Sequence, residues 1–175
     1  MPHPRKRIRQ AFCNRLAEQV GDSYRTRAQT RVYGSRLAPV SEEELKEDGP
    51  AILVYARMEK YNVEKSYGIE GDATYLEREL TIVTEAMLLA GTTVDDALDD
   101  IAEEMEAAFE GFVIPGFESA RIRLTESDID VITDQVKRPV GAIGLVWQVM
   151  YRTEWRPRAT ADDIDADMAD FLAGK

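Results

Sequence analysis

The chain has 175 residues, a formal net charge of −11 and 44% hydrophobic residues. This length suits one compact domain that buries roughly 70% of its extended-chain surface, and the apolar content excludes a disordered polyampholyte. The negative charge argues against general affinity for DNA or anionic membranes, and no apolar run approaches the roughly 18 residues of a membrane-spanning helix. The N-terminal residues lack the apolar core of a secretion signal, so we expect the protein to stay in the compartment where it is made.

The N-terminal third predicts a helix, a strand and a short capped helical turn. Apolar side chains recur every fourth residue over Arg5–Val20, which is typical of an amphipathic helix. Tyr24–Arg36 alternates between arginine-rich and smaller or apolar positions, so it predicts a half-exposed strand with a basic outer face. Ser41 followed by Glu44 matches a capping box and predicts the start of a helical turn.

The middle of the chain predicts two strands and an amphipathic helix. Ala51–Glu59 is apolar on both faces, as in a strand at the centre of a sheet. Lys60–Asp72 is polar and contains glycines, so it predicts a long, mobile hairpin connection. Tyr75–Leu89 predicts the next strand, and Val94–Phe109 carries an apolar stripe suited to a helix that lies on a sheet.

The C-terminal part predicts two more strands, Ser119–Leu124 continuing loosely through Ile129–Ile132, and Ala142–Trp155. The order of elements predicts an α+β fold, with a mostly antiparallel mixed sheet of about five strands and two main helices packed on one face. Residues 1–155 are expected to form this single domain, and residues 156–175 an acidic C-terminal tail. The apolar residues of this tail share one stripe that favours a short helix: Ile164, Met168, Phe171 and Leu172.

Opposite charges are concentrated in two parts of the chain. Residues 5–36 hold nine Arg or Lys against two acidic residues, whereas residues 79–120 hold eleven Asp or Glu and no base. This split predicts that identical copies associate, basic surface against acidic surface. The basic cluster could instead grip phosphates or simply flank a buried helix start, and the acidic row could be an ordinary solvated helix face.

Aromatic residues within the predicted connection Lys60–Asp72 more often mark a protein contact than a ligand site. Together with the charged surfaces, they give the expected subunit and partner interface. Its members are Arg25, Arg27, Arg31, Tyr33, Tyr61, Tyr67, Asp95, Asp99 and Glu103.

The sequence offers little for catalysis. Its single histidine, His3, lies beside the N-terminus, and its single cysteine, Cys13, falls among apolar helical positions, which argues against His-based catalysis and a transition-metal site. Three carboxylates on predicted strands, or the acidic row Asp95–Glu110, could bind Mg²⁺ together with a phosphate, but no local spacing resembles a nuclease or phosphatase motif. The three strand carboxylates are Glu59, Glu77 and Glu79. We expect no catalytic residue, no metal and no cofactor.

In chain order, the sequence contains an Arg-rich helix (RKRIRQAFCNRL), a strand with exposed arginines (YRTRAQTRVY) and an apolar strand after a short acidic connector (PAILVYARMEK). A further strand (LERELTIVTEA) leads into an acidic amphipathic helix (TTVDDALDDIAEEMEAAF), and the last strand (GAIGLVWQVMYRTEW) has an aromatic-x-Thr ending. Over about residues 5–155, this order resembles the tail terminator proteins of long-tailed bacteriophages, also called tail completion or minor tail proteins.

The resemblance implies a mixed sheet with helices packed on it, in a structural virion protein rather than an enzyme. It implies a ring, commonly a hexamer, that caps the growing tail tube, ends its elongation and offers a surface for head attachment. The implied partners are other copies of the chain, the major tail tube protein and head-completion or neck proteins. DNA would pass through the channel without specific binding, and no membrane is involved. The implied location is the head-proximal end of the virion tail, after assembly in the host cytoplasm.

Three rival interpretations remain open. A related head–tail connector or neck protein would also form a ring, but its loss would leave full-length tails that cannot join heads. A nucleic-acid-binding accessory protein that uses the basic N-terminal region would show DNA affinity that falls steeply with salt. A Mg²⁺-dependent phosphodiesterase would lose its activity through one carboxylate change such as Glu59→Gln.

Overall fold

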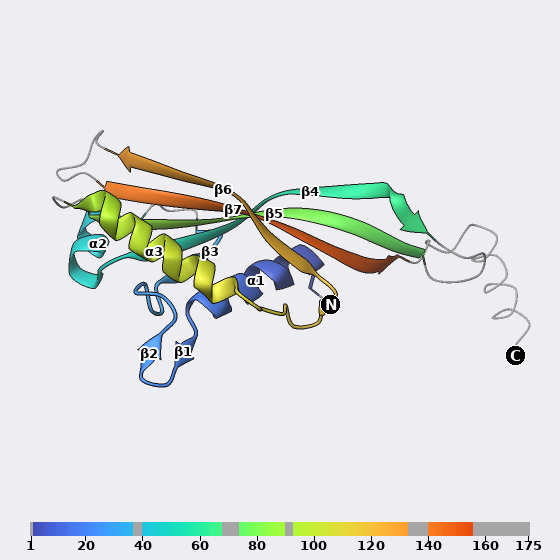
Figure 1. Cartoon of the computed structure of the whole chain (residues 1–175), viewed down its shortest axis with the longest axis horizontal. Coiled ribbons are helices and arrows are strands. Elements are labelled where there is room, and N and C mark those ends of the chain that lie inside the picture. Colours follow the sequence, from blue (N-terminus) through green and yellow to red (C-terminus); the bar gives the residue numbers. More distant parts are fainter. Residues whose placement is uncertain (1, 37–39, 68–73, 90–92, 133–139, 156–175) are drawn as a thin grey trace, which may run out of the picture.

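The computed structural model describes residues 2–36, 40–67, 74–89, 93–132 and 140–155. These residues form an α+β fold with three helices and a five-stranded mixed sheet (Figure 1). The elements in chain order are α1 (Pro4–Leu16), β1 (Gln19–Val20), β2 (Ser23–Tyr24), β3 (Val32–Gly34), α2 (Glu42–Asp48), β4 (Ala51–Tyr67), β5 (Thr74–Leu89), α3 (Val94–Phe109), β6 (Arg121–Ile132) and β7 (Val140–Trp155).

The five-stranded sheet has the order β3-β4-β5-β7-β6. β3 runs parallel to β4, and the other neighbouring pairs are antiparallel, so the predicted mostly antiparallel mixed sheet is confirmed. β5 and β7 pair continuously from Thr74↔Trp155 to Leu89↔Val140. β1 and β2 form a separate small hairpin (Figure 1).

The helices α1 and α3 cover one face of the sheet, as the sequence predicts. Their apolar stripes meet alternate residues of β4, β5 and β7 in one core, because successive side chains of a strand point to opposite faces. An aromatic cluster joins the two helices to the sheet, with the rings of Phe12 and Phe109 4.3 Å apart and those of Phe109 and Trp147 4.8 Å apart. The largest fully buried residues of this core include Phe12, Ile8, Leu16, Leu80, Ile82, Leu98, Ile101, Met105 and Tyr151.

The short helix α2 packs on the opposite face, near one end of the sheet. Its Leu45 joins a smaller core with Leu53 and Met87, which alternate along their strands with residues of the larger core. The capping box predicted for this helix is confirmed: the Glu44 amide donates to the Ser41 hydroxyl, and the Ser41 amide donates to the Glu44 carboxylate. The core therefore lies on both faces of the sheet at this end.

The prediction of one continuous strand over Tyr24–Arg36 is wrong. Only β2 and β3 are strands here, and the chain between them makes turns in which the Gln29 amide donates to the Thr26 carbonyl. Gln29 has a positive φ of 54°, which an extended strand does not allow. Thr26 is buried, and its hydroxyl donates to the carbonyl of Leu16, so this segment is tied to the end of α1.

The prediction of a loop over Lys60–Asp72 is wrong for its first part, because β4 continues to Tyr67. β4 pairs with β5 through Lys60↔Glu79, Tyr61↔Arg78 and Asn62↔Glu77. Residues 68–72 of the predicted connection lie outside the described residues. We call this part of the sheet the arm: residues 58–67 of β4, 74–81 of β5 and 148–155 of β7, whose far end extends beyond α1 (Figure 1).

Two predicted boundaries also differ from the structure. α1 ends at Leu16, four residues before the predicted end, and Val20 is 52% exposed on the small hairpin. β6 is one continuous strand over Arg121–Ile132 with an irregularity between Leu124 and Glu126, rather than two loosely connected parts. The predicted acidic tail, residues 156–175, lies outside the described residues.

Candidate functional site

The predicted interface arginines Arg25 and Arg27 have partners within their own chain. The Arg25 guanidinium lies 2.5 Å from the Glu18 carboxylate. Arg27 binds Glu104 of α3 twice, through its amide at 2.7 Å and its Nε at 2.9 Å, and its Nη2 lies 3.3 Å from Asp100. These contacts tie the turn after β2 to α3, so the basic segment meets the acidic helix within one subunit.

The charge states of these groups are consistent with this pairing. Burial acts to lower the pKa of Arg27, but the hydrogen bonds and charges of Glu104 and Asp100 outweigh it and raise the pKa. Hydrogen bonds from Arg25 and Arg15 lower the pKa of Glu18. Arg27 and Glu18 are therefore charged at neutral pH.

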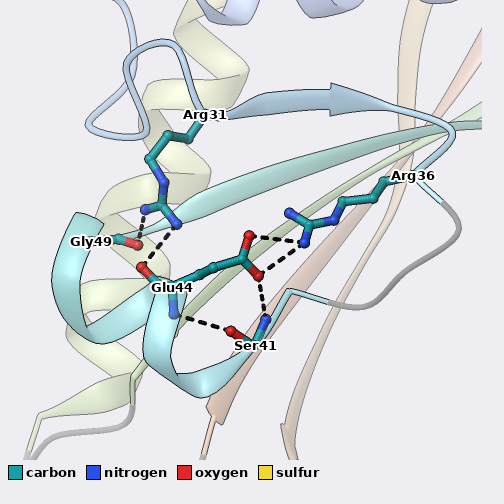
Figure 2. Close-up of polar contacts among 5 residues, drawn as sticks. All are labelled: Arg31, Arg36, Ser41, Glu44 and Gly49. Carbon is teal, nitrogen blue, oxygen red and sulfur yellow. Dashed lines mark hydrogen bonds and ion pairs between the residues drawn. The ribbon is translucent and has the colours of Figure 1, made fainter.

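Arg31 and Arg36 hold α2 against β3, in an arrangement that we call the α2 clasp (Arg31, Arg36, Ser41, Glu44 and Gly49; Figure 2). Arg31 donates to the carbonyl of Gly49 at the C-cap of α2, to that of Glu44 in the first half of the helix, and to that of Pro50 at 2.7 Å. Arg36 donates to both carboxylate oxygens of Glu44 at 2.9 Å. The Ser41 amide and Arg36 together lower the pKa of Glu44. Arg31 thus binds both the first half of α2 and its C-cap within the subunit.

Tyr33, also predicted at the interface, lies beside this clasp. Its ring packs against the smaller core, and the Arg36 guanidinium lies 5.1 Å from the ring centroid. Tyr33 is half-buried, so part of the ring is still accessible. The roles of Arg31 and Arg36 were not predicted from the sequence, because both side chains bind groups of α2 and its C-cap, outside the alternating pattern of Tyr24–Arg36.

The acidic residues Asp95, Asp99 and Glu103 share the outer face of α3, as predicted from their spacing. All three are exposed. Within the described part of the chain, no ion pair engages them, in contrast to Asp100 and Glu104 on the neighbouring stripe of the same helix. Among the described residues, this row therefore forms an exposed acidic surface without a cationic partner.

A buried polar network stands at the base of the arm. The Tyr151 hydroxyl donates to the Glu59 carboxylate, and Arg78 Nη1 lies 3.3 Å from the same carboxylate. Arg78 Nε also donates to the Thr153 hydroxyl at 2.8 Å, and its guanidinium lies 4.9 Å from the Tyr61 ring. The side chains of Arg78 and Glu59 are only 13% and 6% exposed. The network joins all three strands of the arm.

The network changes the interpretation of Glu59, one of the carboxylates considered for Mg²⁺. Burial, and then the hydrogen bond to Glu59, raise the pKa of Tyr151, so this phenol stays protonated and donates at neutral pH. The Glu59 carboxylate is thus already engaged by Arg78 and Tyr151. No group of three or more His, Cys, Asp or Glu side chains is placed to hold a metal ion among the described residues.

The arm carries exposed apolar side chains on both sides of this network. Met58, Tyr61 and Tyr75 are 48%, 53% and 47% exposed. The side chain of Tyr67, predicted at the interface, lies outside the described residues. β3 pairs with β4 only over Ile52–Val54, so the outer edge of β4 has no strand partner beyond that point in the described part of the sheet. The arm therefore presents both apolar surface and an open strand edge.

The sheet face opposite α1 and α3 carries an acidic groove of about 280 Å³. The carboxylates that line it come mainly from β6, and Arg57 of β4 is a cation among them. Burial and the nearby Glu85 raise the pKa of Tyr55 at the edge of this groove. The four carboxylates are Glu85, Glu126, Asp128 and Asp130. This surface was not predicted from the sequence, because the residues that line it come from four strands, β4, β5, β6 and β7.

Comparison with known proteins does not assign the chain. No protein-family model matches it, and no curated protein matches its sequence. The tail terminator resemblance therefore remains a prediction from the sequence. None of the described helices is long and apolar enough to cross a membrane.

Proposed function

We propose that this protein is a ring-forming structural component of a long-tailed bacteriophage, acting as the tail terminator at the head-proximal end of the tail. The ring would cap the tail tube, end its elongation and provide the surface for head attachment. Its action is steric and depends on surface contacts with other copies, the tube protein and neck proteins.

The observation that carries this proposal is the arm. Exposed Tyr and Met side chains distributed along a projecting element are typical of a protein contact, because Tyr and Met are enriched at interfaces. The buried network of Glu59, Arg78 and Tyr151 fixes the three strands relative to one another, which reduces the entropy lost when a partner binds. An open edge of β4 offers backbone groups for further strand pairing.

The charge distribution supports a different interface from the one expected from the sequence. Arg25, Arg27 and Arg31 bind groups within their own subunit. The acidic outer face of α3 therefore binds a surface of its neighbour other than these arginines. A closed ring needs two different surfaces on each subunit, repeated head to tail. We assign one surface to the arm and the other to an acidic surface, either the outer face of α3 or the open face of the sheet.

Deletion of the gene in the phage, followed by electron microscopy of the lysate, tests this proposal. Loss of a terminator gives overlong or headless tails, and a plasmid copy restores normal particles. Full-length tails that fail to join filled heads would identify a neck protein instead. Normal infectious particles without the gene product would refute both assignments.

A further inference from the structure

The outer side of α1 carries a groove that the proposed function does not use. It has a volume of about 540 Å³ and lies between α1 and the segment that follows α3. Its floor and walls include Ala11 of α1 and the half-buried Phe112, with the exposed Pro115 at one end. A groove of this size falls within the roughly 300–1,000 Å³ typical of sites that hold compact ligands.

The groove is basic along most of its length. Lys6, Arg7 and Arg15 line it, against the single carboxylate of Glu18. Glu18 is already bound by Arg15 and Arg25 at 2.5 Å each, so it adds little free negative charge. The groove thus combines apolar surface with net positive charge, which suits an acidic segment that also carries apolar side chains.

The chain itself contains such a segment beyond its described part. Residues 161–172 carry five Asp and no base. The spacing of four apolar residues, at i, i+4, i+7 and i+8, places them on one stripe of a helix. These residues are Ile164, Met168, Phe171 and Leu172. An isolated helix of this length is marginal in water, so it needs a surface to pack on.

The end of β7 lies within reach of the groove. The Arg7 guanidinium, which lines the groove, is 4.6 Å from the Phe117 ring centroid, and the Phe117 and Tyr151 rings are 5.4 Å apart. From Tyr151 the strand runs only four residues, about 13 Å, to its end at Trp155. Residues 156–163 can span up to about 27 Å when extended, which is enough for a return to α1.

We propose that residues 161–172 dock in the α1 groove of the same chain as a short amphipathic helix. The apolar stripe lies on Ala11 and Phe112, and the aspartates face Lys6 and Arg7. Because the pairing is partly electrostatic and exposed to solvent, salt weakens it. The inference is independent of the phage assignment, since it rests only on the groove and on the segment.

A paramagnetic spin label on the full-length protein tests this docking. The label is attached at Gln10→Cys, an exposed groove position; Cys13 is buried and does not compete for it. We expect loss of the amide NMR signals of residues 161–172. The same label at Asp99→Cys, an exposed position in the first half of α3 that does not line the groove, should leave these signals intact.

Two further samples decide between outcomes. Adding Phe171→Asp to the Gln10→Cys protein should restore the signals, because a charge replaces the aromatic residue of the apolar stripe. Mixing spin-labelled, NMR-silent protein with isotope-labelled wild type reports contacts between chains only. Signals of residues 161–172 that stay intact in the Gln10→Cys sample would overturn the proposal. Signal loss of the same extent in the mixture would overturn it too, because the segment of another copy would then fill the groove.

Discussion

The buried ion pair at the base of the arm gives the sharpest test of how the arm is held. In Arg78→Met, the Glu59 carboxylate keeps the Tyr151 hydroxyl but loses its cation, while its side chain is only 6% exposed. Removing one member of a buried pair typically costs about 3–5 kcal/mol. Arg78 is itself 13% exposed, so we expect the lower end, about 3 kcal/mol, in the free energy of unfolding.

Urea unfolding of dilute protein, followed by circular dichroism, measures this cost. For a chain of this size, a loss of about 3 kcal/mol corresponds to a fall in Tm of roughly 6–12 °C. Arg152→Met is the matched control: it breaks an Arg–Glu pair on the same arm, but its side chain is 52% exposed, and we expect a cost within about 1 kcal/mol.

A double variant separates the bare charge from the lost packing. In Arg78→Met with Glu59→Gln, the amide oxygen can still accept from Tyr151 and no unpaired carboxylate is buried. We therefore expect the double variant to be more stable than Arg78→Met alone. If Arg78→Met costs less than about 1 kcal/mol, or if the double variant is the less stable of the two, the pair does not anchor the arm as described.

Three other predictions concern the packing of the subunit. Gly141→Ala should lower the free energy of unfolding by about 1–3 kcal/mol in urea titrations, because the added Cβ would lie 2.6 Å from the Val94 side chain of α3; an unchanged midpoint would contradict the close approach. Ser41→Ala should cost about 1 kcal/mol by removing the cap of α2, and Ser41→Gly distinctly less. Burial raises the pKa of Cys13 from 9.0 to about 11, despite the opposing charge of Arg9. Native protein at pH 9 should therefore react with a thiol reagent far more slowly than urea-unfolded protein, and stability should fall as pH rises from 9 toward 11; equal reaction rates would show an accessible thiolate.

The sequence predicted best where a local period controls the structure. Val94–Phe109 forms α3 with the predicted bounds, because its apolar residues follow the helical repeat. The capping box at Ser41 was readable because both partners lie within four residues. The buried start of β4 was readable from its unbroken apolar run, and Ala51–Val54 are all buried.

Prediction failed where distant residues decide the conformation. The alternation over Tyr24–Arg36 looks like a strand, but Arg27 binds Glu104, 77 residues away, and Gln29 adopts a positive φ. The polar sequence after Lys60 looks like a loop, yet it forms a strand because β5 supplies partners on its inner edge. No short window contains the cross-strand contact of Arg78 with Thr153, so the network at the base of the arm could not be predicted.

The mass of the purified protein in solution tests the central claim most directly. Size-exclusion chromatography with light scattering, combined with negative-stain microscopy, should detect closed rings at high protein concentration. Met58→Asp with Tyr75→Asp should shift the mass to that of one chain, whereas Val20→Asp, which changes an equally exposed residue on the small hairpin, should not. A wild-type protein that stays monomeric at every concentration, or rings that survive both arm substitutions unchanged, would contradict assembly through the arm.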